Sequence, residues 1–363
     1  MTKSSQSYPM SGGDGQHSYI HHSSYQKAAI DGAEEKTRQC ILENLDVLNL
    51  NPDLSTFTIA DFGCSIGPNT FHVVQAIIDT VKMKYKQVKE NNEVSSLMPL
   101  EFQVFFNDQS NNDFNTLFKT QPPSSEREYF LVGVPGSFYG RVLPRNSIHI
   151  GHTSYTTHWL SKIPEHVGDK KSPAWNKNNI ICNNSIEEVT NAYKVQFIKD
   201  MKVFLEARAE EIVPGGLMIV LGQCLPDGIP FFKTWQGIVV DTIGDCLMDM
   251  AKSGLTTEEK IGLFNIPVYF PQFSELRREI EKNRSFTIET MENVRHPLED
   301  IPLSHDFMIS MFRAILSTII KEHFGECVID ELFDRVASQL VKYPIDIKKC
   351  EKDMNFFILL KRK

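Results

Sequence analysis

The chain has 363 residues, which at about 150 residues per domain corresponds to one large elaborated domain or a domain with a cap. Apolar residues make up 41 % of it, with 24 Phe, 10 Tyr and 3 Trp, which is enough to bury a sizeable core and excludes wholesale disorder. The 38 Lys and Arg residues against 46 Asp and Glu leave a net charge of −8, which disfavours a protein held mainly by nucleic-acid phosphates.

The N-terminal residues contain no apolar run that could serve as the core of a secretory signal. The best apolar run of the chain, Leu217–Leu221, is far too short to span a bilayer. Seven cysteines are scattered without a C-x-x-C pair, and their odd number argues against a closed disulfide framework. We therefore expect a soluble, cytoplasmic protein with reduced thiols and no membrane partner.

After a polar N-terminal arm, helices and strands alternate in a way that is typical of a parallel sheet. The expected strands in this part of the chain are Thr56–Phe62, Glu101–Asn107, Tyr129–Val134, Ser147–His152 and Leu217–Leu221. The expected helices are Ser23–Leu48, Thr70–Tyr85 and Ile186–Ile212. The interleaving predicts a doubly wound α/β sheet.

The last third of the chain has a mainly helical pattern. Helices are expected at Phe232–Ser253, Ser274–Lys282, His305–Phe324 and Val328–Val341, and short strands at Ser285–Thr290 and Asn355–Leu360. We expect an arm and helix over 1–50 that close the active site, an α/β core over 51–225, a substrate cap over 226–345 and a terminal strand over 346–363 that returns to the sheet. A basic cluster at Lys82, Lys84, Lys86 and Lys89 is interpreted as a solvated helix face.

Ligands of open α/β sheets bind outside the carboxyl ends of the strands, and the first strand here ends in ADFGCSIGPN at residues 60–69. Gly63 and Gly67 are four positions apart, so the G-x-G-x-x-G fingerprint of dinucleotide-binding proteins fails, and no Lys-Ser/Thr pair of a phosphate loop follows. Asp61 adds an anion to this loop of small residues. The loop therefore favours a nucleoside that carries positive charge over one that carries phosphates.

The next two strand ends offer further contacts to such a nucleoside. Asp108 follows the second strand, where a carboxylate can accept hydrogen bonds from both ribose hydroxyls, although a strand-end Asp also commonly caps a helix or a turn. Ser137 and Phe138 follow the third strand in a turn that offers a hydroxyl and an aromatic face to an adenine. The alternative for this turn is tight packing of its aromatic side chains into the core.

Segments in the same order along nearly the whole chain resemble the plant SABATH methyltransferases, the salicylic acid, benzoic acid and theobromine synthase family. These segments are MSGGDGQHSY at 10–19, ADFGCSIGPN at 60–69, FNDQSNNDFN at 106–115, GVPGSFYGRVLPRNSIH at 133–149, SYTTHWLSKIP at 154–164, VPGG at 213–216, FNIPVY at 264–269 and HFGE at 323–326. The resemblance implies a Rossmann-like sheet that binds S-adenosyl-L-methionine (SAM), an α-helical cap and, usually, a homodimer.

The resemblance also assigns cofactor contacts in this sequence. The residues at family positions that contact SAM are Tyr19, Asp61, Cys64, Asn69, Asp108, Ser137 and Phe138. By this resemblance Asp108 would hold the ribose, and Ser137 with Phe138 would flank the adenine. Ser11 stands where some members carry Lys, and Gln109 stands where Leu is common, so the affinity for SAM is expected to differ.

The acceptor site follows from the same resemblance. The residues that match it are Gln26, Tyr155, His158, Trp159, Val240 and Phe312. Gln26 and Trp159 match the residues whose N–H groups donate to the substrate carboxylate. A carboxylic acid is already ionised at neutral pH, so its methylation needs donors that position it and no general base. Val240 replaces a Trp that is common in salicylate-type members, which predicts a pocket of altered shape.

A divalent ion, often assigned as Mg²⁺, is implied near the acceptor edge of the family fold. The matching positions here are Asn176, Asn265 and the backbone of Phe264. The Asp found just upstream in the family is replaced by Gly262, which removes the only charged ligand of a cation that normally binds carboxylates or phosphates.

The sequence thus predicts a SAM-dependent carboxyl O-methyltransferase that converts a small plant acid to its methyl ester. N-methylation of a xanthine-like heterocycle stays open as an alternative, and His158 would be the nearby candidate base. A catalytically silent relative that holds SAM or a hormone is a second alternative. An NAD-dependent oxidoreductase is disfavoured by the missing fingerprint.

Overall fold

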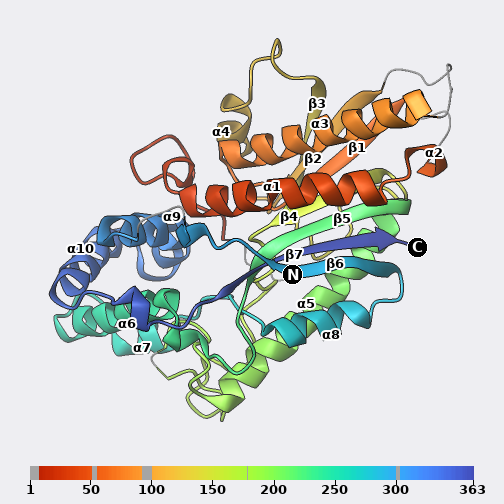
Figure 1. The fold of residues 1–363 in the computed structure, drawn as a ribbon. Helices are drawn as coiled ribbons and strands as arrows, with labels where there is room; N and C mark the ends of the chain where they lie inside the picture. Colours follow the sequence, from red (N-terminus) through yellow and green to blue (C-terminus); the bar gives the residue numbers. More distant parts are fainter. Residues whose placement is uncertain (1–7, 51–54, 92–99, 178, 300–302) are drawn as a thin grey trace, which may run out of the picture.

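The computed structural model describes residues 8–50, 55–91, 100–177, 179–299 and 303–363, so residues 1–7 of the expected arm lie outside the described residues. A sheet with strand order β3-β2-β1-β4-β5-β7-β6 runs through the molecule (Figure 1). Its strands are β1 Thr56–Phe62, β2 Glu101–Asp108, β3 Tyr129–Pro135, β4 Ile148–Ser154, β5 Ile212–Cys224, β6 Phe286–Val294 and β7 Met354–Arg362. The first five strands pair in parallel, and β7 is antiparallel to both β5 and β6. The expected α/β sheet is confirmed.

Helices cover both faces of this sheet. The helices are α1 Ser24–Asn44, α2 Val47–Leu50, α3 Pro68–Asn91, α4 Phe114–Lys119, α5 Glu187–Glu211, α6 Trp235–Lys252, α7 Glu258–Leu263, α8 Phe273–Glu281, α9 His305–Phe324 and α10 Cys327–Lys342. α1 and α3 lie side by side on one face, whereas α5 and α8 cover the other (Figure 1). The run Phe356–Leu360 in β7 is buried throughout, because apolar side chains of a central strand pack against helices on both sides.

The cap consists of α6, α7, α9 and α10, which pack around their own apolar core at one end of the sheet (Figure 1). α9 begins at Ser304, whose hydroxyl accepts a hydrogen bond from the N–H of Phe307, and ends at Gly325 with a φ of 97°. The expected cap range 226–345 also contains β6 and α8. These two elements belong to the sheet layers, because β6 pairs with β7 and α8 packs on α5.

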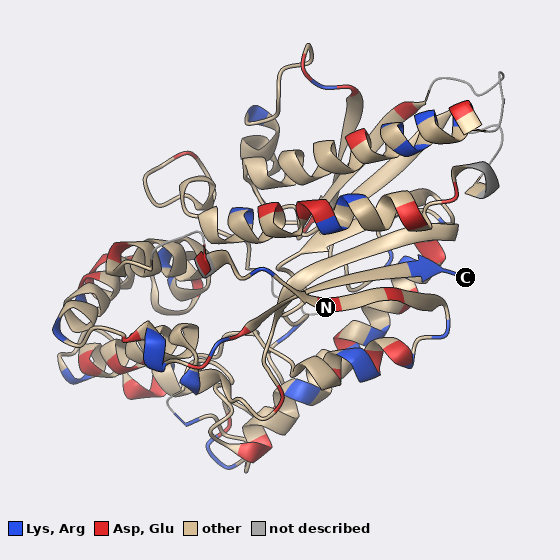
Figure 2. Cartoon of the chain, in the orientation of Figure 1, with Lys and Arg blue, Asp and Glu red and all other residues tan. Residues whose placement is uncertain are grey.

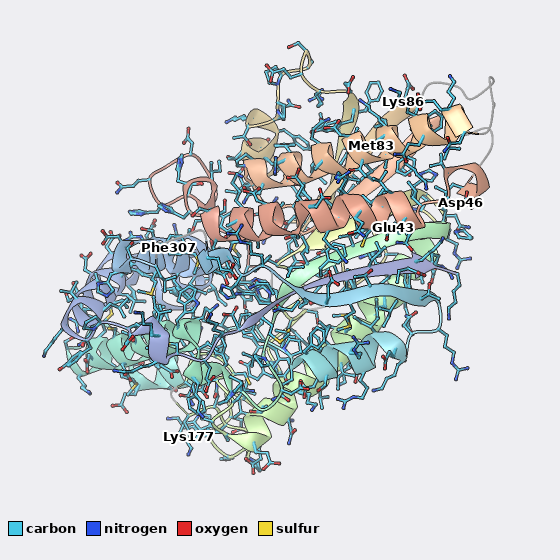
Figure 3. All side chains as sticks on the ribbon, in the orientation of Figure 1. Glu43, Asp46, Met83, Lys86, Lys177 and Phe307 are labelled. Atoms are coloured by element: carbon cyan, nitrogen blue, oxygen red, sulfur yellow. The ribbon has the colours of Figure 1, made fainter. Side chains whose placement is uncertain are left out.

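Acidic and basic side chains are interspersed along the outer helices (Figure 2). Two lysines of α3 form contacts within the protein: Lys82 pairs with Glu128, and the Lys84 ammonium donates to the carbonyl of Leu42 at 2.6 Å. Lys86 lies at the end of α3 away from the cap (Figure 3). These contacts agree with a solvated helix face. Within the described ranges, every helix is too short or too polar to traverse a bilayer.

Candidate active site

The carboxyl ends of the parallel strands open into a cleft of about 1340 Å³, which we call the cofactor cleft. Its walls include Tyr19, Gly63, Ser65, Asp108, Ser137 and Phe138. Four of the expected SAM residues, Tyr19, Asp108, Ser137 and Phe138, are therefore brought together from the arm and from two strand ends. This placement agrees with the rule that open α/β sheets bind ligands at this edge.

The glycine loop after β1 turns sharply at the mouth of the cofactor cleft. Gly63 has a φ of 85°, and a Cβ atom there would lie 2.1 Å from a methyl carbon of Thr156, so the position requires glycine. Ser65 also adopts a left-handed conformation, with a φ of 52°. This conformation directs its N–H to Asp108 Oδ2 at 2.7 Å.

Asp108 is prepared to accept further hydrogen bonds. Each carboxylate oxygen accepts one backbone N–H, from Ser65 and from Gln109, and both distances are 2.7 Å. Burial raises the pKa of Asp108 to about 6, because the two N–H groups offset only part of the lost hydration. At neutral pH the group is mostly ionised, and each oxygen retains a lone pair for a ligand hydroxyl.

The other three expected SAM residues do not line the cofactor cleft. Asp61 is buried behind the loop, where it accepts a hydrogen bond from Thr70 and its Oδ1 lies 2.7 Å from His152 Nδ1. Cys64 is buried in the apolar core under α1 and α3. Asn69 donates to the backbone carbonyl of the N-cap residue of α1 at 3.1 Å. In this structure these residues hold the loop and α1 in place.

A buried ion pair that sequence reasoning missed fixes the turn after β3. The side chains of Arg208 and Glu211 are both 0 % exposed and are joined by an Nε–Oε2 hydrogen bond of 2.7 Å. Arg208 donates to the carbonyls of Phe138 and Gly140 at 2.8 and 3.0 Å, and Glu211 accepts the N–H groups of residues 142–143. The signal in the sequence that could have indicated this ion pair is the position of Arg208 on the buried face of an amphipathic helix.

The N-terminal arm crosses the cofactor cleft and is attached on both sides. On the sheet side, the N–H of Tyr8 donates to Gln109 Oε1 at 2.8 Å. On the cap side, the N–H of Ser11 donates to the carbonyl of Ala314 in α9 at 3.0 Å. Ser11 and Gln109, two of the positions at which the sequence departs from the family pattern, therefore both help to hold the arm, together with Asp113, whose Oδ2 accepts the N–H of Gly13 at 2.9 Å.

A second hollow, which we call the acceptor pocket, encloses about 740 Å³ between the sheet edge and the cap. All the expected acceptor residues line it: Gln26, Tyr155, His158, Trp159, Val240 and Phe312. The described residues that line it include no Asp, Glu, Lys or Arg. The residues that it shares with the cofactor cleft are Met10, Tyr19, Tyr155 and Trp159, so these four mark the junction of the two spaces.

Trp159 is held rigidly at this junction. Its carbonyl accepts the hydroxyl of Tyr139, its backbone N–H donates to the carbonyl of Thr156 at 3.0 Å, and it forms a β-bridge with Val268. Gln26 reaches the pocket from the first turn of α1, and its Oε1 is buried without a hydrogen-bond partner in the described part of the chain. A half-turn of the carboxamide presents its N–H groups instead, so both residues can donate to a pocket ligand.

His158 is enclosed by aromatic rings. Burial lowers its pKa to about 4, so the imidazole is neutral at physiological pH. Its Nδ1 atom is buried, and none of the residues that the structure describes forms a hydrogen bond with it. An imidazole of such low basicity suits a wall of the pocket better than a proton acceptor.

Two residues just before and within β7, Asp353 and Asn355, hold side chains of the acceptor pocket in place. Gln223 donates to the hydroxyl of Tyr25 at 2.7 Å and to Asp353 at 2.8 Å. The hydroxyl of Tyr155 donates to the side-chain oxygen of Asn355. These contacts fix two aromatic walls of the acceptor pocket, and no local motif in the sequence indicated them.

The expected metal residues do not fit Mg²⁺. The Asn176 amide donates to Asn265 Oδ1 at 2.9 Å and to a backbone carbonyl at 3.0 Å, so the Asn176 N–H groups and the Asn265 carboxamide oxygen are already hydrogen-bonded within the protein. Phe264 is buried in the core of the cap. A Cβ atom on Gly262 would lie 3.8 Å from the side chain of Lys170, so a cationic residue stands beside the missing carboxylate. Mg²⁺ normally requires anionic oxygen ligands, which this set lacks.

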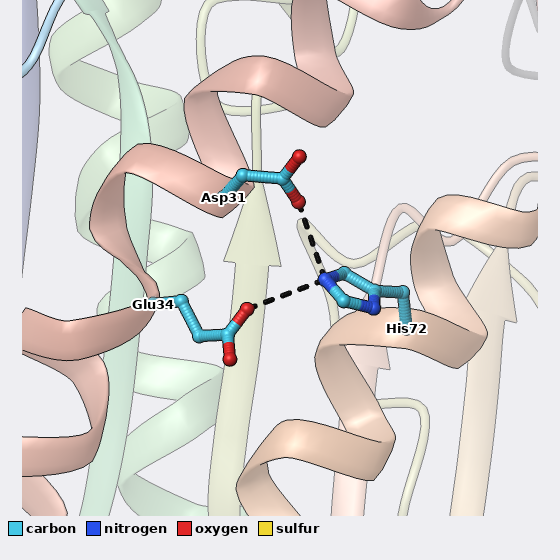
Figure 4. Close-up of side chains that lie close together, drawn as sticks. All are labelled: Asp31, Glu34 and His72. Carbon is cyan, nitrogen blue, oxygen red and sulfur yellow. Dashed lines mark ion pairs between the residues drawn. The ribbon is translucent and has the colours of Figure 1, made fainter.

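A group of possible metal ligands in the described part of the chain, Asp31, Glu34 and His72, lies on the surface outside both spaces. His72 Nε2 is 3.2 Å from Asp31 and 3.3 Å from Glu34 (Figure 4). All three side chains are between 43 % and 49 % exposed. They connect α3 to α1, the helix that carries Tyr25 and Gln26 into the acceptor pocket.

Known proteins similar to this chain agree with this arrangement. A family model described as SAM dependent carboxyl methyltransferase matches residues 5–363. The chain is 72 % identical, over the full length of both proteins, to a probable S-adenosylmethionine-dependent methyltransferase of Arabidopsis thaliana. In the same plant it is 43 % identical to a farnesoic acid carboxyl-O-methyltransferase, over 99 % of both chains, and 42 % identical to paraxanthine methyltransferase 2, over 98 % of this chain and 99 % of the relative.

The solved structure of a loganic acid methyltransferase with S-adenosyl-L-homocysteine (SAH) has the same fold. It matches with a TM-score of 0.91 at 43 % identity, over 98 % of this chain and 99 % of that one. Together with the family model, these similarities establish a SAM-dependent methyltransferase. The chain belongs to the SABATH family of SAM-dependent carboxyl methyltransferases.

Proposed function

We propose that the protein transfers the methyl group of SAM to the carboxylate of a small plant acid, giving a methyl ester and SAH. The observation that carries this proposal is the position of Trp159, which lines both the cofactor cleft and the acceptor pocket. With Gln26, it offers neutral N–H groups in a pocket whose described lining contains no ionised acid or base. Such a site suits an acceptor that arrives already anionic.

In the proposed reaction, a carboxylate oxygen attacks the methyl carbon while the bond from carbon to sulfur breaks, and its electron pair stays on sulfur. The negative charge of the carboxylate and the positive charge of the sulfonium are both neutralised, and no proton moves. The protein therefore contributes position and exclusion of water, which together supply a large part of such rate enhancements. Neutral donors hold the oxygen without the strong ground-state binding that a cationic clamp would add.

Four residues are proposed to hold SAM. Asp108 has acceptor capacity for the ribose hydroxyls, and the turn with Ser137 and Phe138 lies beside it in the cofactor cleft. Tyr19 lies at the junction with the acceptor pocket. The buried Arg208–Glu211 pair supports the turn from behind.

The alternative of N-methylation draws support from the 42 % identical paraxanthine methyltransferase. A xanthine N–H must lose its proton, and His158 is the candidate base in this pocket. Its pKa of about 4 makes it a weak base, which favours the acceptor that needs none.

An acceptor screen with radiolabelled SAM, containing both carboxylic acids and xanthines, tests the proposal. We expect methyl esters from one group of acids and no methylated xanthine. In the variant with both Gln26→Ala and Trp159→Phe, kcat/KM for the acid should fall by about 100-fold or more, while the SAM dissociation constant changes little. Unchanged turnover in this variant would reject the role of the two donors. SAM binding without turnover on any acceptor would indicate the silent relative.

Two further expectations concern the context of the enzyme. We propose a homodimer in the cytoplasm, as the sequence resemblance and the sequence pattern suggest. Light scattering on the purified protein tests the dimer, and fractionation of plant cells tests the location.

A further inference from the structure

On the cap side of the acceptor pocket, two buried polar atoms have no hydrogen-bond partner among the described residues. They are the indole Nε1 of Trp235 and the carboxamide Oε1 of Gln236, in the first turn of α6. The two residues are 2 % and 7 % exposed. Buried polar groups in folded proteins are nearly always paired, so an unpaired donor and an unpaired acceptor on consecutive residues that line one ligand pocket indicate a missing ligand group.

Both residues lie away from the reacting end of the pocket. Trp235 and Gln236 line the acceptor pocket but not the cofactor cleft, whereas Trp159 lines both. The ring of Trp235 is 6.1 Å from the ring of Tyr25 and 6.1 Å from that of Phe312, so α1 and α9 hold it in place. An acid whose carboxylate reaches Trp159 therefore extends its other end toward α6.

We infer that Trp235 and Gln236 form a polar subsite that recognises a hydroxyl group on the acid, remote from its carboxylate. This inference rests on the proposed carboxyl methylation. A hydroxyl can accept a hydrogen bond from the indole N–H and donate one to the carboxamide oxygen at the same time. A ketone satisfies only the donor, and a hydrocarbon satisfies neither.

The rest of this wall defines the remainder of the substrate. Val240 of α6 and Phe312 and Leu316 of α9 present apolar surface of the cap to the pocket, so the carbon skeleton of the acid must be largely hydrocarbon. A second carboxylate or an ammonium group would be buried without an opposite charge. The substrate class is thus an apolar monocarboxylic acid with one remote hydroxyl.

Matched pairs of acids that differ by one hydroxyl test the subsite. We would measure kcat/KM with radiolabelled SAM for octanoic and 8-hydroxyoctanoic acid, and for 3-phenylpropanoic and 3-(4-hydroxyphenyl)propanoic acid. We expect the hydroxylated member of at least one pair to be preferred by about tenfold or more, because sites with buried hydrogen-bonding groups reject ligands that leave them unpaired. Equal kcat/KM within both pairs would overturn the inference.

Variants locate the preference. Gln236→Leu keeps much of the side-chain volume and should remove most of the preference, by lowering kcat/KM for the hydroxy acid and sparing its partner. Trp235→Phe should act in the same direction. Val240→Leu, a matched control, narrows the pocket without changing a polar group and should affect both members of a pair alike. An equal loss for both members in Gln236→Leu would contradict the inference.

Two more readouts separate this inference from a structural role and from the proposed function. Since Gln236 Oε1 has no partner, Gln236→Leu should not lower the melting temperature. Calorimetric binding of the same acids in the presence of SAH reports on the subsite without catalysis. Binding that prefers the hydroxy acid and depends on Gln236, with no methylation of any acid, would reject the function and keep the subsite. Methylation of acids without any preference for the hydroxylated member would reject the subsite and keep the proposed function.

Discussion

The imidazole of His158 stacks on the phenyl ring of Phe270, with ring centroids 5.0 Å apart and planes inclined at 22°. Phe270 stacks in turn on Phe231, at 4.8 Å and 16°. This column of rings forms one wall of the acceptor pocket and keeps water from the imidazole, which lowers its pKa to about 4.

The first prediction concerns the pH dependence of methyl transfer. Because His158 loses its proton near pH 4, we expect kcat for an acid substrate at saturating SAM to stay constant between about pH 6.5 and 8.5. His158→Gln should lower kcat/KM by less than about tenfold and create no new inflection. A loss of about 100-fold or more, the effect typical of a general base, would contradict the role of a pocket wall.

The second prediction concerns the affinity for SAM. Asp108 has a raised pKa of about 6 in the free protein, and the ribose hydroxyls require the ionised form, which is lost as pH falls. Calorimetry should show SAM binding that is constant above about pH 7 and weakens progressively below about pH 6. Asp108→Asn should weaken binding by about 10- to 100-fold and remove this pH dependence. A mutant that retains the same pH dependence would show that another group titrates.

The third prediction concerns the buried pair behind the turn after β3. Arg208→Met leaves Glu211 as an uncompensated buried charge, so we expect the free energy of unfolding to fall by about 3–5 kcal/mol. The turn with Phe138 loses its anchor, so KM for SAM should rise. Denaturant unfolding and SAM titration check the two effects. Replacing both charges with Met should destabilise the protein by less than the sum of the single changes, because the partners are coupled. Strict additivity would argue against the coupling.

The fourth prediction concerns divalent ions. The carboxamide oxygen of Asn265 already accepts a hydrogen bond from the Asn176 amide, and Lys170 lies beside Gly262 where a carboxylate is missing. We therefore expect dialysis against EDTA, and readdition of Mg²⁺, to change kcat/KM by less than about twofold. The melting temperature should be equally insensitive. A large loss of activity that Mg²⁺ restores would show that the enzyme requires a divalent ion and would contradict this prediction.

The fifth prediction concerns the N-terminal arm. Gln109→Leu removes the acceptor for the N–H of Tyr8, so the arm loses one attachment on the sheet side of the cofactor cleft and keeps the hydrogen bond from Gly13 to Asp113. We expect faster release of SAH in stopped-flow measurements and faster proteolysis within residues 8–18. Gln75→Leu on the outer surface of α3, where Gln75 bonds only to the neighbouring turn at Asp79, is a control. Equal rates of proteolysis in both variants would show that Gln109 does not hold the arm.

The sequence predicted the elements whose signals are local. β1 and α9 have the expected bounds, because each combines an apolar pattern with clear end signals. α4 and α7 were missed, since six residues are too few to display a helical period. The acceptor residues were located by family motifs, and the structure brings them into one pocket.

Contacts between distant parts of the chain could not be predicted. Gln223 meets Asp353 across 130 positions, and no pattern in either segment indicates the other. Asp61 illustrates the same limit, because its position at a strand end suggested a ligand contact. Its partner in the structure is instead His152, 91 positions away.

Because β7 lies between β5 and β6 in the sheet but follows both in the chain, the sheet can be completed only late in synthesis. A nascent chain can assemble the five parallel strands early, because domains begin to fold while translation continues. The residues that fix Gln223 and Tyr155 are Asp353 and Asn355, which are synthesised after every residue that lines the two spaces. Catalytic competence should therefore arise only when β7 pairs between β5 and β6, and ribosome-bound chains that end before β7 should be inactive.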